Sequence, residues 1–175
     1  DKRYNVSKTI HGQILGTPGF MAPEQLLGTQ HDIDIRADIY ALGGLLYNML
    51  CLRAPHAELD LKELFNNKLA GNIPSPSERS GKKKLPHIPD GKIPAALNSV
   101  VKKAMAVAPV NRYQTPLQLQ EDIECYMEGY ATDAESASQL RLLSLLFLRH
   151  KRLGFWLVLL LGMIILYMAQ NYFTL

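Results

Sequence analysis

Several common patterns are missing from this 175-residue sequence, and each absence excludes a class of protein. There are only two cysteines, Cys51 and Cys125, and no C-x-x-C pair, which excludes a disulfide scaffold and a cysteine-based zinc site. Both cysteines lie in apolar, helix-like surroundings, so we expect two buried, reduced thiols. No stretch alternates between apolar and polar residues as a strand does, and no segment repeats. The sequence therefore predicts a mainly α-helical fold.

Positive charge is present only in modest excess, with a formal net charge of +3. Much of the excess lies in residues 82–84, which are all lysine, and in a second group at Arg149, Lys151 and Arg152. Neither group is interleaved with aromatic side chains, so we expect no nucleic-acid partner. Residues 82–84 are interpreted as a solvated loop, with a docking site for an acidic partner as the alternative.

Histidine occurs five times but never at the spacing of metal ligands. His31 stands close to Asp32 and Asp34, yet carboxylates at this place are typical of residues that cap the N-terminus of a helix. We therefore expect that the chain itself binds no metal.

Apolar residues at helical spacing predict a series of helices. A short helix should begin at Pro23, because a first helical residue needs no N–H. A longer helix should begin near Asp32 or Asp34, and it is apolar on every side, which indicates the buried centre of a helical domain. Gly43 and Gly44 weaken that helix by about 1 kcal/mol each, so we expect another element to approach its backbone closely there. Further helices are predicted over residues 61–69, 93–107, 115–128 and 140–148.

The C-terminal end carries no charged residue from 153 to 175. About 20 apolar residues cross the ~30 Å hydrocarbon layer of a membrane, so we predict a single transmembrane helix over residues 153–173. Trp156 and Tyr167 near its ends suit the two interfaces. The alternative is a buried helix of a soluble protein. The basic group at Arg149, Lys151 and Arg152 precedes the run, which places the preceding part of the chain in the cytoplasm.

Residues 131–152 connect the helical domain to this span. Within them, residues 140–148 could form an amphipathic helix on membrane lipid, because one arc of the helix is largely polar. The alternative is a helix continuous with the membrane span. The polar arc consists of Ser138, Arg141, Ser144, Lys151 and Arg152.

Three motifs, in order and in register, carry a resemblance to a known family. They are GTPGFMAPEQ at 16–25, DIRADIYALGGLLYNML at 34–50 and NRYQTPLQLQEDI at 111–123. From residue 7 to about residue 130 the chain resembles the C-terminal lobe of eukaryotic-like serine/threonine protein kinases, in particular bacterial membrane-anchored ones. Ala22-Pro23-Glu24 resembles the A-P-E signature of that family. The resemblance implies that residues 1–130 are the lower, helical part of a kinase C-lobe, from the activation segment to its last helix.

The resemblance implies a parent protein that transfers the γ-phosphate of ATP to serine or threonine of proteins in signalling, with Mg²⁺. The family's Gly-rich loop, catalytic H-R-D and metal-binding D-F-G are absent from the 175 residues. Phosphoryl transfer depends on those groups. We therefore expect this chain alone to be inactive and without cofactor, and the active parent to include a missing upstream half. Because the sequence begins at Asp1 rather than methionine, it is interpreted as a fragment. The alternative is a non-catalytic, membrane-anchored scaffold of the pseudokinase kind.

The resemblance also assigns roles to particular residues. Glu24 and Arg112 are expected to form an ion pair that ties the activation segment to the helical base, since a guanidinium binds a carboxylate through two parallel hydrogen bonds. This role is structural and regulatory rather than catalytic. The alternative is two independent surface charges.

Other assignments by resemblance support catalysis or its regulation. Thr17 would hydrogen-bond the catalytic aspartate of the missing half, which favours serine/threonine specificity; otherwise it is a turn residue. Asp38 would accept backbone N–H groups of the catalytic loop; otherwise it is a solvated acid near a helix start. Thr9, and after it Ser7, are candidates for phosphorylation, because a phosphate can order a loop against nearby cations; otherwise they are ordinary loop hydroxyls. No oligomeric state is predicted.

Overall fold

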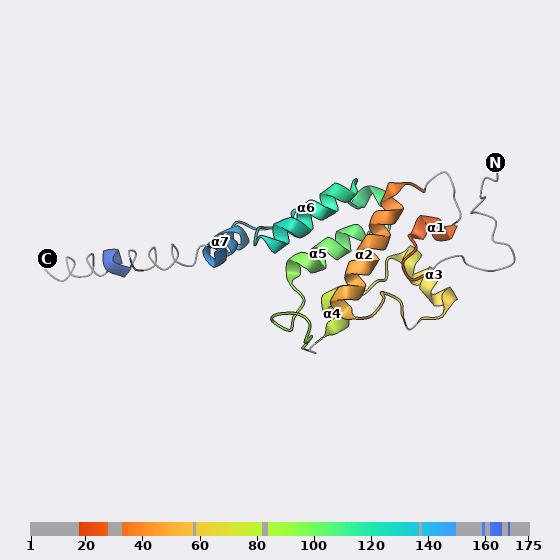
Figure 1. Ribbon diagram of the computed structural model, residues 1–175, viewed down its shortest axis with the longest axis horizontal. Coiled ribbons are helices and arrows are strands. Elements are labelled where there is room, and N and C mark those ends of the chain that lie inside the picture. Colours follow the sequence, from red (N-terminus) through yellow and green to blue (C-terminus); the bar gives the residue numbers. More distant parts are fainter. Residues whose placement is uncertain are drawn as a thin grey trace.

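A computed structural model of the chain shows a bundle of short helices (Figure 1). The structure describes residues 18–27, 33–57, 59–81, 84–136, 138–149, 159, 162–165 and 168. Within these residues all regular secondary structure is helical, which confirms the predicted mainly α fold.

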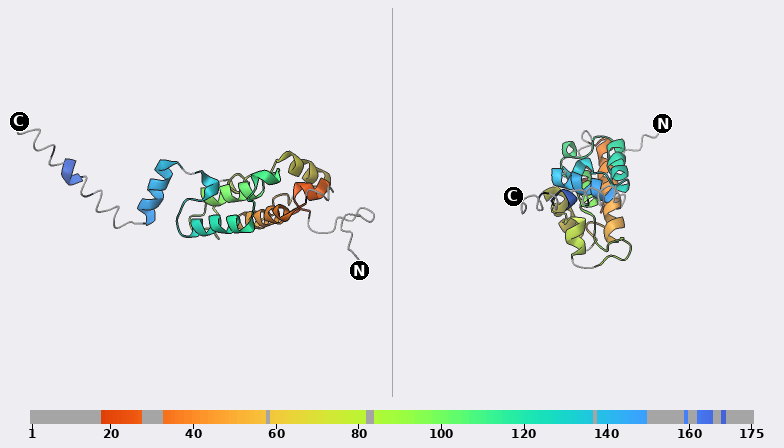
Figure 2. Two further views of the ribbon diagram at one scale, coloured as in Figure 1. Left: turned by 90° about the horizontal axis from the view of Figure 1, so that it is seen from above. Right: turned by 90° about the vertical axis from the view of Figure 1, so that its left-hand side faces the viewer.

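The described elements include seven labelled α-helices and two 3₁₀ turns, and residues 159, 162–165 and 168 are also helical. The labelled elements are α1 (Pro23–Leu27), α2 (Ile35–Cys51), α3 (Leu61–Ala70), α4 (Pro76–Ser80), α5 (Ala95–Ala104), η2 (Pro109–Asn111), α6 (Pro116–Met127), η3 (Asp133–Glu135) and α7 (Gln139–Arg149). Helix α2 runs through the bundle, with α4 and α5 packed against it and α1 against α3. Helix α7 lies beyond the bundle, at the end opposite α1 and α3 (Figures 1 and 2).

The helix starts follow local capping chemistry. Asp34 is the residue that caps α2, and its side chain accepts a hydrogen bond of 2.8 Å from the N–H of Arg36. This settles the start of the helix in favour of Asp34. Thr115 caps α6 through the N–H of Gln118, and Pro116 occupies the first helical position, as the sequence predicts.

Other parts of the bundle approach α2 closely at its two glycines. A Cβ atom on Gly43 would lie 2.7 Å from the Cβ of Ala104 on α5. A Cβ atom on Gly44 would lie 2.9 Å from Cδ1 of Phe20, in the loop before α1. The predicted close approach to this backbone is therefore confirmed, and the absence of side chains at 43 and 44 is what permits it.

Helix α2 is central to the bundle, as predicted, but one of its faces is exposed, although its apolar sequence had indicated burial. Met49 is 67% exposed and Ile35 is 53% exposed, and Leu42 and Leu45 are about half exposed with them. These residues recur at helical spacing and form a single stripe. The reason is that α4 and α5 pack against the other side of the helix. We call this surface the open face of α2.

The two thiols differ from the expectation in their burial. Cys51 and Cys125 are both free but only partly buried. Cys51 lies at the end of α2 with its Sγ 3.7 Å from the carbonyl oxygen of Pro76, and burial raises the pKa of its thiol.

The predicted helix over residues 140–148 is present as α7, and most of its described leucines are exposed. Among the residues that the structure describes, no helix combines the length and apolarity that a membrane span requires. Most of the span predicted over residues 153–173 lies outside the described residues.

Candidate functional site

The candidate site is the loop formed by residues 18–21 together with helix α1. The loop residues are partly exposed, whereas Ala22 and Glu24 at the start of α1 are buried. The side-chain oxygen of Gln25 accepts a hydrogen bond of 2.8 Å from the N–H of Ala22, which satisfies a free backbone donor at the start of the helix. Two buried cations from other parts of the chain hold this segment in place.

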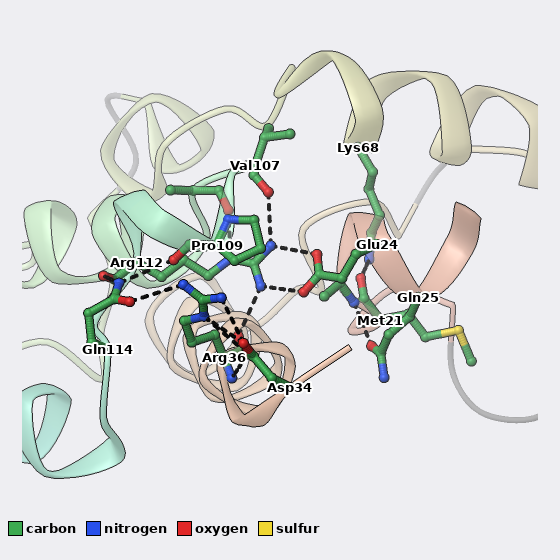
Figure 3. Close-up of polar contacts among 12 residues, drawn as sticks. Met21, Glu24, Gln25, Asp34, Arg36, Lys68, Val107, Pro109, Arg112 and Gln114 are labelled. Atoms are coloured by element: carbon green, nitrogen blue, oxygen red, sulfur yellow. Dashed lines mark hydrogen bonds and ion pairs between the residues drawn. The ribbon is translucent and has the colours of Figure 1, made fainter. Parts of the chain in front are cut away.

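The first cation is Arg112, which follows η2. Its Nη1 and Nη2 atoms each lie 2.7 Å from a different carboxylate oxygen of Glu24 (Figure 3). Arg112 is 2% exposed and Glu24 is 7% exposed. The structure thus brings the two predicted partners together as a buried pair with two parallel hydrogen bonds, the stronger form of a guanidinium–carboxylate contact.

The remaining N–H groups of Arg112 reach backbone carbonyl oxygens. They donate to Ala106 at 2.8 Å, to Arg36 at 2.9 Å and to Val107 at 2.9 Å. Every N–H of the guanidinium therefore has an acceptor, which is the condition under which a buried ion pair is tolerated. Through these contacts Arg112 joins α1, the first turn of α2 and the segment after α5. The sequence motif indicated only the partner Glu24.

The second cation is Lys68 on α3, which is fully buried. Its ammonium donates hydrogen bonds to the carbonyl oxygen of Pro18 at 2.8 Å and to that of Met21. Burial lowers the pKa of Lys68 to about 8. Lys68 is not among the site residues that the sequence predicts. The available signal was its place four residues after Leu64, on the apolar side of an amphipathic helix.

Both cations contact the ring of Tyr40, a fully buried residue of α2. Nζ of Lys68 lies 5.2 Å from the ring centroid, and Cζ of Arg112 lies 4.9 Å from it. Cations at such distances are attracted by the ring quadrupole. Burial raises the pKa of Tyr40, and its hydroxyl has no hydrogen-bond partner among the described residues. The ring therefore supports both cations without using its polar atom.

His56, in the connection between α2 and α3, is a third buried basic group. Within the described part of the chain its Nε2 atom has no hydrogen-bond partner. Burial, and then the charges of Lys68 and Arg79, lower the pKa of His56 to about 4. The imidazole is therefore neutral near pH 7.

A separate polar cluster fixes the chain where it leaves α6. The carboxylate of Asp122, buried on α6, accepts hydrogen bonds from the hydroxyl of Tyr113 at 2.7 Å and from the N–H of Ala134 at 3.0 Å. Lys103 on α5 pairs with Asp133 at 2.8 Å and lies 4.4 Å from the centroid of the Tyr113 ring. These contacts hold η3 against α5 and α6.

The other predicted site residues are not part of this arrangement. Asp38 is exposed on α2, within the stripe that forms the open face. Thr17, Thr9 and Ser7 lie outside the described residues, so their roles stay predictions. His31 also lies outside them. Over the described residues, no cluster of histidine, cysteine or acidic side chains is arranged to hold a metal ion.

Comparison with known proteins agrees with this geometry. Residues 2–122 match the family model described as "Protein kinase domain". The chain therefore belongs to the protein kinase domain family. Similar proteins include the serine/threonine-protein kinases PknD of Chlamydia pneumoniae, at 41% identity over 121 residues, and of Chlamydia felis, at 39% over 121 residues. PknD of Chlamydia muridarum is 36% identical over 123 residues.

The aligned part is 69% of this chain for the first two relatives and 70% for the third. In each case it is only 12% of the length of the relative. The similarity thus concerns a short part of much longer proteins.

Proposed function

We propose that this chain is the lower part of the C-lobe of a membrane-anchored serine/threonine protein kinase, and that its loop at residues 18–21 helps to receive the protein substrate. The observation that carries the proposal is the buried Glu24–Arg112 pair. It joins the A-P-E-like segment to the helical base across 88 residues of sequence. The similarity to PknD kinases supports serine/threonine rather than tyrosine as the acceptor.

In this proposal the chain does not itself bind ATP and Mg²⁺. Its sequence contains no G-x-G-x-x-G, H-R-D or D-F-G motif, and these groups supply the phosphate and metal contacts of kinases. The parent protein would carry both ligands on an upstream half. The present chain would contribute the support for the activation segment.

The open face of α2 supports the existence of such an upstream half. Its exposed apolar residues, Ile35, Leu42, Leu45 and Met49, form one stripe on the central helix of the bundle. Contiguous exposed apolar surface is typical of an interaction site. We infer that the upstream half covers this stripe in the parent, with Asp38 within the contact.

The membrane part of the proposal depends on residues 153–173 and on α7. The run is free of charge, and it follows the basic residues Arg149, Lys151 and Arg152. Helix α7 exposes apolar side chains that could enter a lipid surface. They are Leu140, Leu142, Leu143, Leu146 and Leu148. The positive-inside tendency would place the kinase part in the cytoplasm.

A phosphorylation assay tests the kinase proposal. The purified chain, mixed with ATP, Mg²⁺ and a generic protein substrate, should incorporate no phosphate. A longer chain that restores the upstream half should phosphorylate serine or threonine. If the longer chain binds partner proteins but never transfers phosphate, the non-catalytic scaffold is the correct reading. Activity of the short chain after removal of contaminating kinases would contradict the assignment of ATP to the upstream half.

A topology assay tests the anchor. A reporter that is active only outside the cytoplasm, fused after Leu175, should be active. Replacing Leu160 and Ile164 by arginine should remove the protein from the membrane fraction or leave it aggregated, because each such charge costs about 2.5–3.5 kcal/mol at the centre of the hydrocarbon layer. A chain that fractionates as a soluble monomer without detergent would contradict the proposed anchor.

A further inference from the structure

We propose that Lys68 is a positioning residue for the protein substrate, because its buried ammonium holds the backbone of residues 18–21 in the shape that receives the substrate. The substrate role of this loop rests on the proposed kinase function. The hold of Lys68 on the loop does not, and it can be tested separately.

The contacts of Lys68 are directed at the backbone of the loop. Nζ donates to the carbonyl oxygens of Pro18 and Met21, which are 50 and 47 residues away in sequence. These two acceptors lie at the two ends of the loop, so a single ammonium fixes its span. Figure 3 shows the lysine side chain reaching down from α3 toward Met21.

Lys68 and the loop that it binds differ in their exposure to solvent. Lys68 is fully buried, whereas Pro18, Gly19, Phe20 and Met21 are each partly exposed. The loop thus covers the ammonium and presents its other side to solvent. A substrate would meet the loop, and Lys68 would act only through it.

Filling space in the core does not by itself explain why a charged side chain is buried at position 68. Both hydrogen-bond acceptors of Lys68 are carbonyl oxygens, which do not neutralise its charge, and burial opposes the charged form. A methionine would fill similar volume without the desolvation cost. Methionine lacks the charge that contacts the ring of Tyr40, and it lacks the N–H donors, two of which bind the carbonyl oxygens of the loop.

The loop is also held by its side chains and by the helix that follows it. Phe20 packs against the backbone of α2 at Gly44, and Glu24 is bound by Arg112. Lys68 differs from these two contacts because it acts on the backbone between them. Removing it should therefore loosen the loop while α1 stays attached to the helical base.

Hydrogen exchange on the full chain in detergent micelles measures this effect. Lys68→Met should speed exchange of the amides in residues 19–22 by about tenfold or more, the effect of losing charged hydrogen bonds, with α5 and α6 unchanged. Lys62→Met is the matched control, because Lys62 is exposed on the same helix. It should leave the loop unchanged. Equal exchange in the Lys68→Met variant and the unmodified chain would overturn the proposal.

If the Lys68→Met variant does not fold, the hydrogen bonds of Lys68 can be tested by NMR on the unmodified chain. With ¹⁵N at Nζ and ¹³C at the carbonyls, scalar coupling across the hydrogen bonds should connect Lys68 to Pro18 and Met21. A resolved Lys68 ammonium signal without such coupling would overturn the contact.

The substrate role is tested in a longer chain that restores the upstream half. There Lys68→Met should raise KM for a peptide substrate about tenfold, the same loss of charged hydrogen bonds, and leave KM for ATP unchanged. An unchanged peptide KM, or an equal loss for both substrates, would overturn the positioning role. If the longer chain has no activity at all, the kinase proposal fails while the exchange result on the loop still stands.

Discussion

Glu24 and Arg112 face each other in the interior with both nitrogen–oxygen distances at 2.7 Å. Because the guanidinium also binds three backbone carbonyl oxygens, the pair connects α1 to two other parts of the chain. Its removal should therefore affect the whole bundle rather than α1 alone.

Arg112→Ala should lower the free energy of unfolding by about 3–5 kcal/mol, because it leaves the carboxylate of Glu24 buried without its charge partner. Urea unfolding of the chain in detergent would measure the loss. The matched control is Arg36→Ala, since Arg36 pairs with Asp34 at a partly exposed position. That change should lower the free energy of unfolding much less, because solvent screens an exposed ion pair. Strictly additive effects of Arg112→Ala and Glu24→Ala would show that the pair does not interact.

Alanine substitutions at three glycines should have graded effects. Gly43→Ala would place a Cβ 2.7 Å from the Cβ of Ala104, and neither α2 nor α5 can yield easily, so we expect a loss of about 1–3 kcal/mol. Gly44→Ala should cost less, because it meets the ring of Phe20, which can rotate. Gly19→Ala is the control, with no atom within 4 Å of its Cβ position. Thermal unfolding would rank the three, and equal midpoints for Gly43→Ala and Gly19→Ala would contradict the packing.

The ring of Tyr40 should contribute to the free energy of unfolding, and its hydroxyl should not. Tyr40→Phe should be close to neutral in unfolding free energy, since the hydroxyl has no partner among the described residues. Tyr40→Leu should cost about 2–4 kcal/mol, because it removes aromatic packing and both cation contacts. A double-mutant cycle of Tyr40→Leu with Lys68→Met would measure their coupling. Zero coupling energy would mean that the ring does not support the lysine.

Mild acid should destabilise the chain through His56. Its pKa is about 4 in the folded state and about 6.5 when exposed, so the unfolded state binds more protons between these values. The contribution of His56 is complete above pH 6.5 and is lost as the pH falls toward 4. By linkage, about 2–3 kcal/mol of it is lost between pH 7.5 and pH 4.5.

Urea unfolding of the chain and of His56→Gln, compared at pH 7.5 and pH 4.5, isolates this contribution. The substitution should reduce the difference between the two pH values. An unchanged difference in His56→Gln would show that this imidazole is not buried neutral.

The sequence by itself determined most of the longer helices and the cap at the start of α6, although it did not predict α4. Capping residues such as Asp34 and Thr115 bind a backbone N–H no more than three residues away. The start of such a helix can therefore be predicted from the local sequence. Gly43 and Gly44 predicted that another element approaches the backbone of α2 closely. Glycine weakens a helix, so its presence there indicates that a side chain would not fit. The Glu24–Arg112 pair was accessible because both residues stand inside recognisable motifs.

Only the tertiary structure decided the rest. The exposure of one stripe of α2 depends on which elements pack against the helix. Because apolar residues occur on every side of this helix, its sequence does not show which side is covered. The partners of Lys68 are backbone carbonyls, and the partners of Asp122 include backbone N–H groups; every residue carries these groups, so no side-chain pattern marks them. Tyr40 contacts cations from α3 and from the segment after η2, and it lies on neither. Such contacts join distant parts of the chain, and they exist only once the helices have packed.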